Sequence, residues 1–280
     1  MIELRGKAVA DAHKAILKEK MTGLESGTIT MAVLLVGEDH GANMYADFME
    51  KTAKNFGYGF VRKQLPSTAT HQEVYDALMA LNNDDAVHGI LPLMPMPKQI
   101  DTEQLIDALN PKKDIDGLTT YNIGLVTAGK GGFAPCTAKA CLAILDHYGI
   151  PLEGKHVVVV GRSQVIGKPV ALMVLERHAT VSICHSRTAD LANHVQQADI
   201  VIAAAGRAHM ITANMVKAGA VVIDVGINEL DGKTVGDVDY EAVSKVASAI
   251  TPVPGGVGSV TTTMMLEAVY EAYHARNVNR

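Results

Sequence analysis

The sequence predicts an α/β fold made of two α/β lobes around a cleft. Two observations lead to this fold class. Short apolar runs rich in β-branched residues alternate with helical stretches along most of the chain, which is the pattern of parallel strands joined by crossover helices. The 280 residues are also 48% hydrophobic and 20% charged, the balance of a globular protein long enough for two domains with a core each.

The first half of the chain contains three predicted strands with helices between them. A buried strand at 31–36 ends at Gly37, and a long helix at 41–56 is closed by Gly57. The other elements expected here are strands at 58–65 and 87–93, a helix at 71–81 and a short helix after Asp101.

The second half repeats this alternation of strands and helices. After a helix at 137–148, strands are predicted at 156–160, 180–184, 199–204 and 220–225. This succession is typical of a Rossmann-type dinucleotide-binding domain. A last helix at 262–275 follows a Gly-Gly loop and is expected to pack back onto the first lobe. The predicted domains are therefore 1–139 with 262–280, and 140–261, with a cleft between the lobes.

Composition excludes several classes of partner. The formal net charge of −5 and the 4% aromatic content, with no Trp, argue against nucleic acid. No apolar run is long enough to span a bilayer, and the N-terminus lacks the layout of a secretory signal. The three cysteines and eleven histidines match no disulfide framework or metal-site spacing. We therefore expect a cytoplasmic protein with reduced thiols and no metal site.

The loop after the strand at 156–160 is a candidate phosphate site. It reads Gly161-Arg162-Ser163-Gln-Val-Ile-Gly167-Lys-Pro. Glycine allows the backbone to approach a phosphate closely, and free N–H groups at the start of the next helix can receive the anion. The loop is not a GxGxxG sequence, so by itself it is equally compatible with a plain strand-to-helix turn.

The end of the strand at 180–184 bears on the choice of nucleotide. Enzymes that prefer NAD usually place a carboxylate there for the ribose hydroxyls. This chain has Ser186 and Arg187 instead, and Arg162 is available from the preceding loop. Because guanidinium groups match phosphate oxygens, these residues favour NADP as the cofactor, and the alternative is a solvated basic turn.

Five segments, spread over nearly the whole chain, together resemble the methylenetetrahydrofolate dehydrogenase/cyclohydrolase family. They are Val36 to Tyr45, Gly89 to Pro97, Lys113-Asp-Ile-Asp-Gly117, Gly161 to Pro169, and Thr251-Pro-Val-Pro-Gly-Gly-Val-Gly258. The resemblance implies a two-lobed enzyme that binds a tetrahydrofolate one-carbon derivative in the cleft and forms a homodimer through its nucleotide domains. Such an enzyme oxidises the methylene bridge by hydride transfer to NADP, then hydrolyses the methenyl product to the formyl form.

The same resemblance assigns roles to individual residues. Tyr45 matches the tyrosine that packs against the folate ring, and Asp116 matches the carboxylate that binds the pterin edge. For these two residues the structural alternatives are a core tyrosine and a turn-forming aspartate. The substrate loop and following helix are matched by Pro254, Gly255, Gly256 and Thr261. The NADP positions are matched by Gly161, Arg162, Ser163, Gly167, Ser186 and Arg187, with Ala205, Gly206 and Ile227 on the ring side.

Two positions depart from the family pattern. Met49 stands where the family has a lysine four residues after the tyrosine, and Leu93 stands where it has a glutamine. In the family these two residues act together in the hydrolytic step. Lys51 lies two residues further on, about 200° away around the helix, and should not substitute. We therefore expect the dehydrogenase reaction to be kept and the cyclohydrolase activity to be lost.

Three other interpretations stay open at this point. The chain could be a bifunctional dehydrogenase/cyclohydrolase that makes 10-formyltetrahydrofolate with other groups in place of the lysine and glutamine. It could be a catalytically idle homologue that binds nucleotide or folate and has a regulatory role, although the intact Asp116 and Gly255-Gly256 argue against this. It could also act on another pterin-type carrier.

Overall fold

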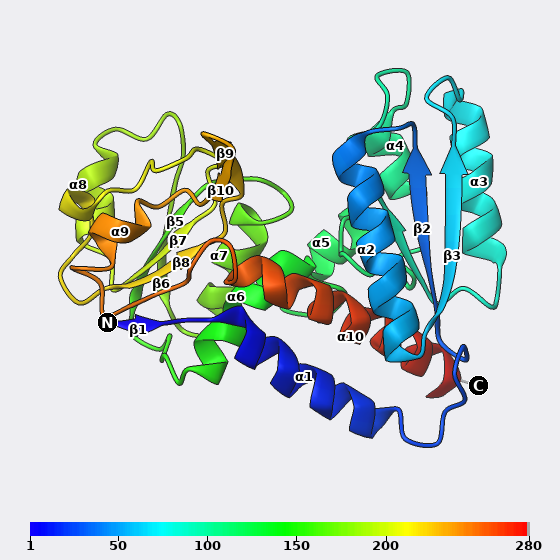
Figure 1. The fold of residues 1–280 in the computed structure, drawn as a ribbon, viewed down its shortest axis with the longest axis horizontal. Coiled ribbons are helices and arrows are strands. Elements are labelled where there is room, and N and C mark those ends of the chain that lie inside the picture. The colour runs from blue at the N-terminus through cyan, green and yellow to red at the C-terminus, as the bar shows by residue number, and fades with distance from the viewer. Residues whose placement is uncertain (279–280) are drawn as a thin grey trace. The chain divides into compact units, whose positions relative to one another are not determined.

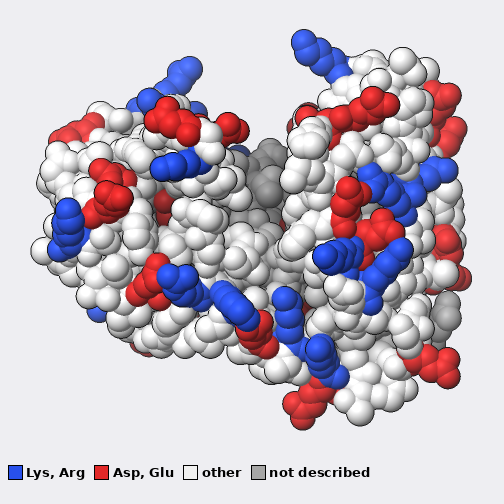
Figure 2. Space-filling view, viewed as in Figure 1, with Lys and Arg blue, Asp and Glu red and all other residues white. Residues whose placement is uncertain are grey.

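The chain forms two compact units in the computed structural model, which describes residues 1–278 and the side chains of residues 1–276. Unit 1 comprises Met1–Ile16 and Pro135–Met264, and unit 2 comprises Leu17–Ala134 and the chain from Met265 on. Within the described residues, none of the helices is both long enough and apolar enough to cross a membrane. On the face seen in Figure 2, basic and acidic side chains are interspersed, without a continuous patch of one sign.

Unit 2 is built on a parallel sheet of three strands in the order β3-β2-β4. The strands are β2 (Thr30–Val36), β3 (Gly59–Leu65) and β4 (Gly89–Pro92), joined by the helices α2 (His40–Phe56) and α3 (His71–Asn83). Figure 1 shows α2 and α3 on opposite sides of β2 and β3. These predicted strands and helices are confirmed, with ends that differ from the prediction by no more than a few residues.

Alternation of side chains along β2 explains how both faces of this sheet are buried. Ala32, Leu34 and Val36 enter a core cluster that includes Val74 and Leu78 of α3. Leu105, from the short helix α4 (Thr102–Asp107), completes this side. The intervening residues of β2 point to the other face and are also buried, as expected for a strand covered on both sides. The helix α5 (Thr120–Thr127), for which the sequence analysis assigned no element, follows.

Both ends of α2 are defined by local interactions. The carboxylate of Asp39 accepts a hydrogen bond from the Ala42 N–H at 2.8 Å and caps the first turn. Gly57 ends the helix in the left-handed conformation, with φ 94°. Its N–H donates hydrogen bonds to carbonyl oxygens of the last turn. The helix that carries two of the predicted active-site positions therefore has a fixed start and end.

Unit 1 contains a parallel sheet of six strands in the order β1-β11-β8-β7-β5-β6. The predicted strands correspond to β5 (His156–Val160), β6 (Thr180–Cys184), β7 (Ile200–Ala203) and β8 (Val221–Asp224). The helices are α6 (Cys136–His147), α7 (Gly167–Glu176), α8 (Leu191–Gln196) and α9 (Tyr240–Val243), with a 3-10 turn, η1 (Ala213–Met215). The buried valine-rich strands and this strand order are those of a Rossmann-type domain, as predicted.

The N-terminal segment belongs to unit 1 rather than to the unit that follows it in the chain. The two-residue strand β1 (Ile2–Glu3) pairs with β11 (Ala249–Ile250), and α1 (Gly6–Lys20) follows it. The sequence analysis had placed residues 1–139 in one domain and assigned no element before residue 31. A strand of two residues has no periodicity to detect, and its long-range pairing with β11 determines where the segment lies.

The last helix and a small hairpin also differ from expectation. The helix α10 begins at Val257 rather than Thr262 (α10, Val257–Val278), and the two compact units divide within it. Residues 279 and 280 of the predicted first domain lie outside the described residues.

The strands β9 (Asn228–Leu230) and β10 (Lys233–Val235) form a hairpin that turns at Asp231 and Gly232, both with positive φ. Asp-Gly is a known signal for such a turn. The hairpin therefore has a local sequence signal, although the sequence analysis assigned no element there.

Candidate active site

The predicted cofactor residues gather at one edge of the unit 1 sheet. The strands β5, β6, β7 and β8 run parallel, and each leads into a loop that carries some of these residues. In chain order the loops contain Gly161–Ser163, Ser186–Arg187, Ala205–Gly206 and Ile227. Ligands of open parallel sheets bind beside the carboxyl ends of the strands. The structure therefore brings these residues to the edge where a dinucleotide is expected.

The loop after β5 requires glycine at both of its ends. Gly161 has φ +137°, and a Cβ there would lie 2.1 Å from the Ala204 carbonyl oxygen. A Cβ on Gly167 would lie 2.3 Å from the Gly161 carbonyl oxygen. Ser163 Oγ accepts hydrogen bonds from the N–H groups of Ile166 and Gly167 at 3.1 and 3.3 Å. Ser163 thus closes the loop at the start of α7, while its neighbour Arg162 is exposed.

The turn after β6 is held by its own polar groups. His185 N–H donates to Thr188 Oγ1 at 2.8 Å, and Thr188 N–H donates to the His185 carbonyl at 2.8 Å. Arg187 N–H donates to His185 Nδ1 at 3.1 Å. The side chains of Ser186 and Arg187 remain exposed at this turn. This set of a hydroxyl and a guanidinium, with Arg162 on the neighbouring loop, fits a ribose 2′-phosphate.

The loop after β7 is held by an aspartate that the sequence analysis did not single out. Asp237, which has no exposed surface, accepts hydrogen bonds from the N–H groups of Ala205 and Gly206 at 2.6 and 2.9 Å. Ile227, on the neighbouring loop after β8, is 72% exposed. The only sequence signal for Asp237 was its place after the Asp-Gly hairpin, because its partners lie about thirty residues earlier in the chain.

The predicted substrate loop at 254–256 packs against the N-terminus of the chain within unit 1. Gly6 N–H donates to the Gly255 carbonyl at 2.9 Å, and a Cβ on Gly6 would lie 2.1 Å from the Gly256 carbonyl oxygen. A Cβ on Gly256 would meet the Pro252 carbonyl oxygen at 2.5 Å, whereas at Gly255 the nearest atom would be 3.9 Å away. Gly256 is thus required for packing, and Gly255 leaves an open, exposed surface. Thr261, on α10, donates to the Val257 carbonyl at 3.3 Å.

The other predicted active-site residues lie in unit 2. Tyr45 and Met49 are one turn apart on α2 and so share a face. The Tyr45 hydroxyl donates to Met265 Sδ at 3.3 Å, while the Met49 side chain has no exposed surface. Leu93 directly follows β4, is 5% exposed, and its N–H donates to the Leu34 carbonyl at 2.9 Å. Neither side chain carries an N–H or O–H group, so neither side chain can activate or orient water.

Asp116 lies in a turn built around a second, buried aspartate. The Asp114 carboxylate accepts hydrogen bonds from the Leu118 and Thr119 N–H groups at 3.0 and 2.9 Å, and from the Thr119 hydroxyl at 2.8 Å. Asp114 also forms a parallel bridge with Ile90 of β4. Asp116 itself is half-buried.

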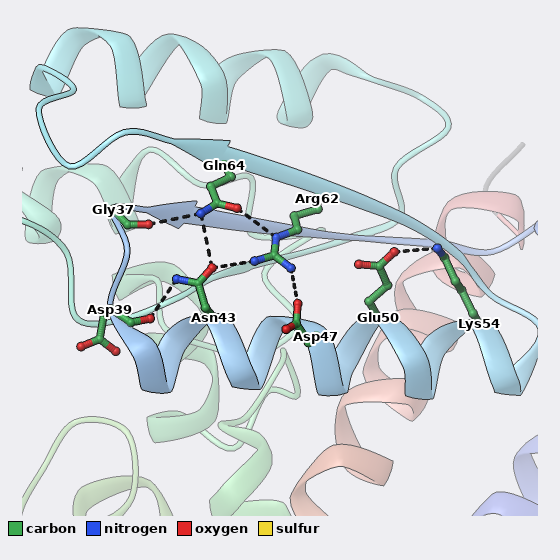
Figure 3. A network of polar contacts seen from close by, with 8 residues as sticks. All are labelled: Gly37, Asp39, Asn43, Asp47, Glu50, Lys54, Arg62 and Gln64. Atoms are coloured by element: carbon green, nitrogen blue, oxygen red, sulfur yellow. Dashed lines mark hydrogen bonds and ion pairs between the residues drawn. The ribbon is translucent and has the colours of Figure 1, made fainter.

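Arg62 of β3 binds two side chains of α2 on the side of the helix toward this strand (Figure 3). The guanidinium donates to the Asp47 carboxylate, to Asn43 Oδ1 at 2.7 Å and to Gln64 Oε1 at 3.2 Å. Asn43 and Asp47 lie two residues to either side of Tyr45, about 200° around the helix. The polar network and the tyrosine therefore lie on opposite faces of α2.

Comparison with known families accounts for both parts of the chain. Residues 4–116 match the catalytic domain of tetrahydrofolate dehydrogenase/cyclohydrolase, and residues 135–277 match its NAD(P)-binding domain. The second match covers the carboxyl edge of the unit 1 sheet described above, with every predicted cofactor residue. The first covers Tyr45, Met49, Leu93 and Asp116.

Individual relatives align over nearly the full length. The chain is 46% identical over 271 residues to the bifunctional protein FolD of Halalkalibacterium halodurans, covering 96% of this chain and 97% of that protein. The bifunctional FolD structure from Campylobacter jejuni is 41% identical, with a TM-score of 0.96 and coverage of 99% of each chain. FolD of Trypanosoma brucei, solved with NADP and an inhibitor, is 32% identical with a TM-score of 0.93, covering 100% of this chain and 99% of that one. The chain therefore belongs to the tetrahydrofolate dehydrogenase/cyclohydrolase family.

Proposed function

We propose that this protein oxidises 5,10-methylenetetrahydrofolate to 5,10-methenyltetrahydrofolate with NADP as the acceptor. The observation that carries the proposal is the set of loops at the carboxyl edge of the unit 1 sheet, where Arg162, Ser186 and Arg187 supply donors for a 2′-phosphate. The complex of the Trypanosoma brucei relative with NADP supports the same cofactor. When bound, NADP supplies a nicotinamide ring that accepts the hydride.

The residues of this chain act mainly by binding and orienting. The Asp116 carboxylate would accept hydrogen bonds from the N–H groups of the pterin edge, and the Tyr45 ring would pack against the folate ring system. The adjacent nitrogen lone pair of the substrate expels the hydride, and the product cation is stabilised by resonance. The reaction therefore demands positioning rather than a strong acid or base.

We also propose that the cyclohydrolase step has been lost. Hydrolysis of the methenyl product needs groups that activate a water and transfer its protons. The two positions that perform this in the family are Met49 and Leu93 here, both buried and both with side chains that carry no polar hydrogen. In addition, the absence of a lysine ammonium removes a charge that would repel the methenyl cation.

A second candidate is the bifunctional enzyme, and the relatives favour it by name. The proteins reported above from Halalkalibacterium halodurans and Campylobacter jejuni are called bifunctional. The two candidates share the oxidation and differ only in the fate of the methenyl product. A homodimer and a cytoplasmic location, predicted from resemblance and composition, are further parts of the proposal.

The candidates are separated by following two products in one assay. Purified protein is mixed with methylenetetrahydrofolate and NADP, and NADPH and methenyltetrahydrofolate are measured separately, with NAD as the comparison nucleotide. Equal amounts of NADPH and methenyl product, corrected for spontaneous hydrolysis, support a dehydrogenase without cyclohydrolase activity. NADPH without methenyl accumulation supports the bifunctional enzyme. No reduction of either nucleotide contradicts both and favours the idle homologue or another pterin carrier.

A further inference from the structure

A single buried carboxylate organises two of the loops at the carboxyl edge of the unit 1 sheet. Asp237 has no exposed surface, and its oxygens accept four hydrogen bonds. Oδ2 receives the N–H groups of Ala205 and Gly206 at 2.6 and 2.9 Å. Oδ1 receives the Arg207 N–H at 2.8 Å and the Asn228 side-chain amide at 2.9 Å. Three successive backbone N–H groups therefore converge on one side chain.

The bonded groups belong to different loops. Residues 205–207 follow β7, and Asn228 comes directly after the exposed Ile227, at the start of β9. Asp237 lies after β10, beyond the hairpin. By binding both loops, the carboxylate sets the distance between Gly206 and Ile227, which are the positions that the sequence analysis placed on the ring side of NADP.

The same bonds determine which part of the nucleotide this loop can receive. Consecutive N–H groups that converge on one point form an anion site, and in many nucleotide-binding proteins a phosphate occupies it. Here an internal carboxylate occupies it, so these N–H groups are not available to the pyrophosphate. Apart from Gly206 itself and its two chain neighbours, no atom lies within 4 Å of where a Cβ of Gly206 would be, so its Cα side is open to a flat ring such as nicotinamide.

A second aspartate holds Asp237 in place. Asp224, at the end of β8, accepts hydrogen bonds from the N–H groups of Asp237, Val238 and Gly226, each at 3.0 Å. A Cβ on Gly236 would lie 1.8 Å from Asp224 Oδ2, so only glycine fits beside this carboxylate. The backbone of Asp237 is therefore held by contacts other than those of its own side chain with the loop after β7.

We propose that Asp237 is a positioning residue for the nicotinamide half of NADP. The inference rests on the proposed function and goes beyond it, because it divides the site into two parts. The loops after β5 and β6 bind the phosphates and the adenosine half. The loops after β7 and β8, joined by Asp237, form the surface for the nicotinamide half. Loss of the carboxylate should weaken binding of the second half and leave binding of the first half unchanged.

The test compares Asp237→Asn with the unchanged protein in three measurements. Asparagine keeps one acceptor but turns an N–H₂ group toward backbone donors, so at least one donor loses its partner. Hydrogen exchange of the amides of residues 205–207 in the nucleotide-free protein should become faster. By calorimetry, NADP affinity should fall about tenfold or more, as expected for lost hydrogen bonds to a charged group. Affinity for 2′,5′-ADP, which lacks the nicotinamide half, should change less than twofold.

The outcomes distinguish a positioning role from a structural one. Equal losses of NADP and 2′,5′-ADP affinity would overturn the proposal, because they would indicate general damage to unit 1. Unchanged NADP affinity despite faster exchange at 205–207 would overturn it as well. If Asp237→Asn does not fold, Asn228→Ala removes one donor to the same carboxylate and should give the same pattern at about threefold; unchanged NADP affinity in that variant refutes the proposal.

Failure of the proposed function gives a different result. If the unchanged protein binds neither NADP nor 2′,5′-ADP, the assignment of the cofactor is wrong. Faster exchange at 205–207 in Asp237→Asn would then still show that the carboxylate holds the loop, while the role toward NADP would be refuted together with the cofactor.

Discussion

Restoring the two missing polar groups is the most direct test of how this protein treats the methenyl product. The variants are Met49→Lys, Leu93→Gln and the double substitution. Met49 has no exposed surface and Leu93 is 5% exposed, so each change introduces a polar group into a buried position. The physical cost of each change and the expected gain in rate can both be estimated from these positions.

The cost is largest for the lysine. Burial lowers the pKa of an introduced lysine below its usual value near 10.4, because the charged form loses its hydration. If the amine had to be neutral at pH 7, the cost would be about 1.4 kcal/mol for each pH unit up to 10.4, or roughly 5 kcal/mol at most. The glutamine should cost about 1–3 kcal/mol unless the lysine hydrogen-bonds it. The double variant should therefore be less destabilised than the two single changes added together.

The gain appears in hydrolysis of methenyltetrahydrofolate. A positioned general base typically contributes about 10²–10⁴-fold in rate, so the double variant should hydrolyse the substrate at least about a hundredfold faster than the unchanged protein. The rate should increase with pH as the amine loses its proton. The assay follows the loss of methenyl absorbance, with stability measured in parallel by urea unfolding.

Lys51→Met is the matched control. Lys51 is exposed and lies two residues from Met49, so its loss should change neither hydrolysis nor stability appreciably. The reasoning would be refuted if the unchanged protein hydrolysed methenyltetrahydrofolate well above the spontaneous rate. It would also be refuted if a folded double variant showed no gain at any pH.

Three further predictions concern other residues. Arg187→Gln should raise the KM for NADP roughly tenfold and leave that for NAD unchanged, measured in initial-rate assays with both nucleotides. Gly117→Ala should destabilise unit 2 by about 2 kcal/mol or more in urea unfolding. The reason is that Gly117 has φ +59° and that a Cβ there would lie 2.2 Å from the Phe133 carbonyl oxygen. An equally stable variant would contradict this prediction. Burial, reinforced by the neighbouring Asp237 carboxylate, raises the pKa of Asp224 to about 6 in the folded protein, against 3.8 as its usual value. As the pH rises, the unfolded chain releases this proton at a lower pH than the folded protein does. This group therefore lowers the free energy of unfolding by up to about 3 kcal/mol between pH 4 and pH 6. The fall in unfolding free energy with pH should be smaller in Asp224→Asn, and an unchanged dependence on pH would refute the assignment.

The longer strands of both units were predicted from the sequence, whereas the short N-terminal strand was not. Strands such as 156–160 and 31–36 are short, apolar and bounded by glycine, so their type and approximate ends follow from the residues themselves. The position of β1 does not, because a strand of two residues is stable only through its pairing with β11 far along the chain. For the same reason, the division of the chain into compact units differs from the predicted domains at the N-terminus.

The candidate site shows the same division between local and long-range information. Gly161, Gly167 and the Ser186-Arg187 turn are recognisable from the sequence because their chemistry is local: a loop leaving a strand, and cations where a carboxylate is more common. The departure from the family pattern at Met49 and Leu93 can also be recognised from the sequence. Met49 is found from its spacing of one helical turn after Tyr45, and Leu93 from its place in a short motif. That both side chains are buried was decided by packing.

Asp237 is the clearest case in which only the tertiary structure carries the information. By itself, an aspartate after an Asp-Gly hairpin is most simply a solvated turn residue. Its three backbone donors lie some thirty residues earlier, and its fourth comes from the next loop. Local sequence can show which residues are able to form hydrogen bonds, but the fold determines which of them meet, because parallel strands bring loops from distant parts of the chain to one edge of the sheet.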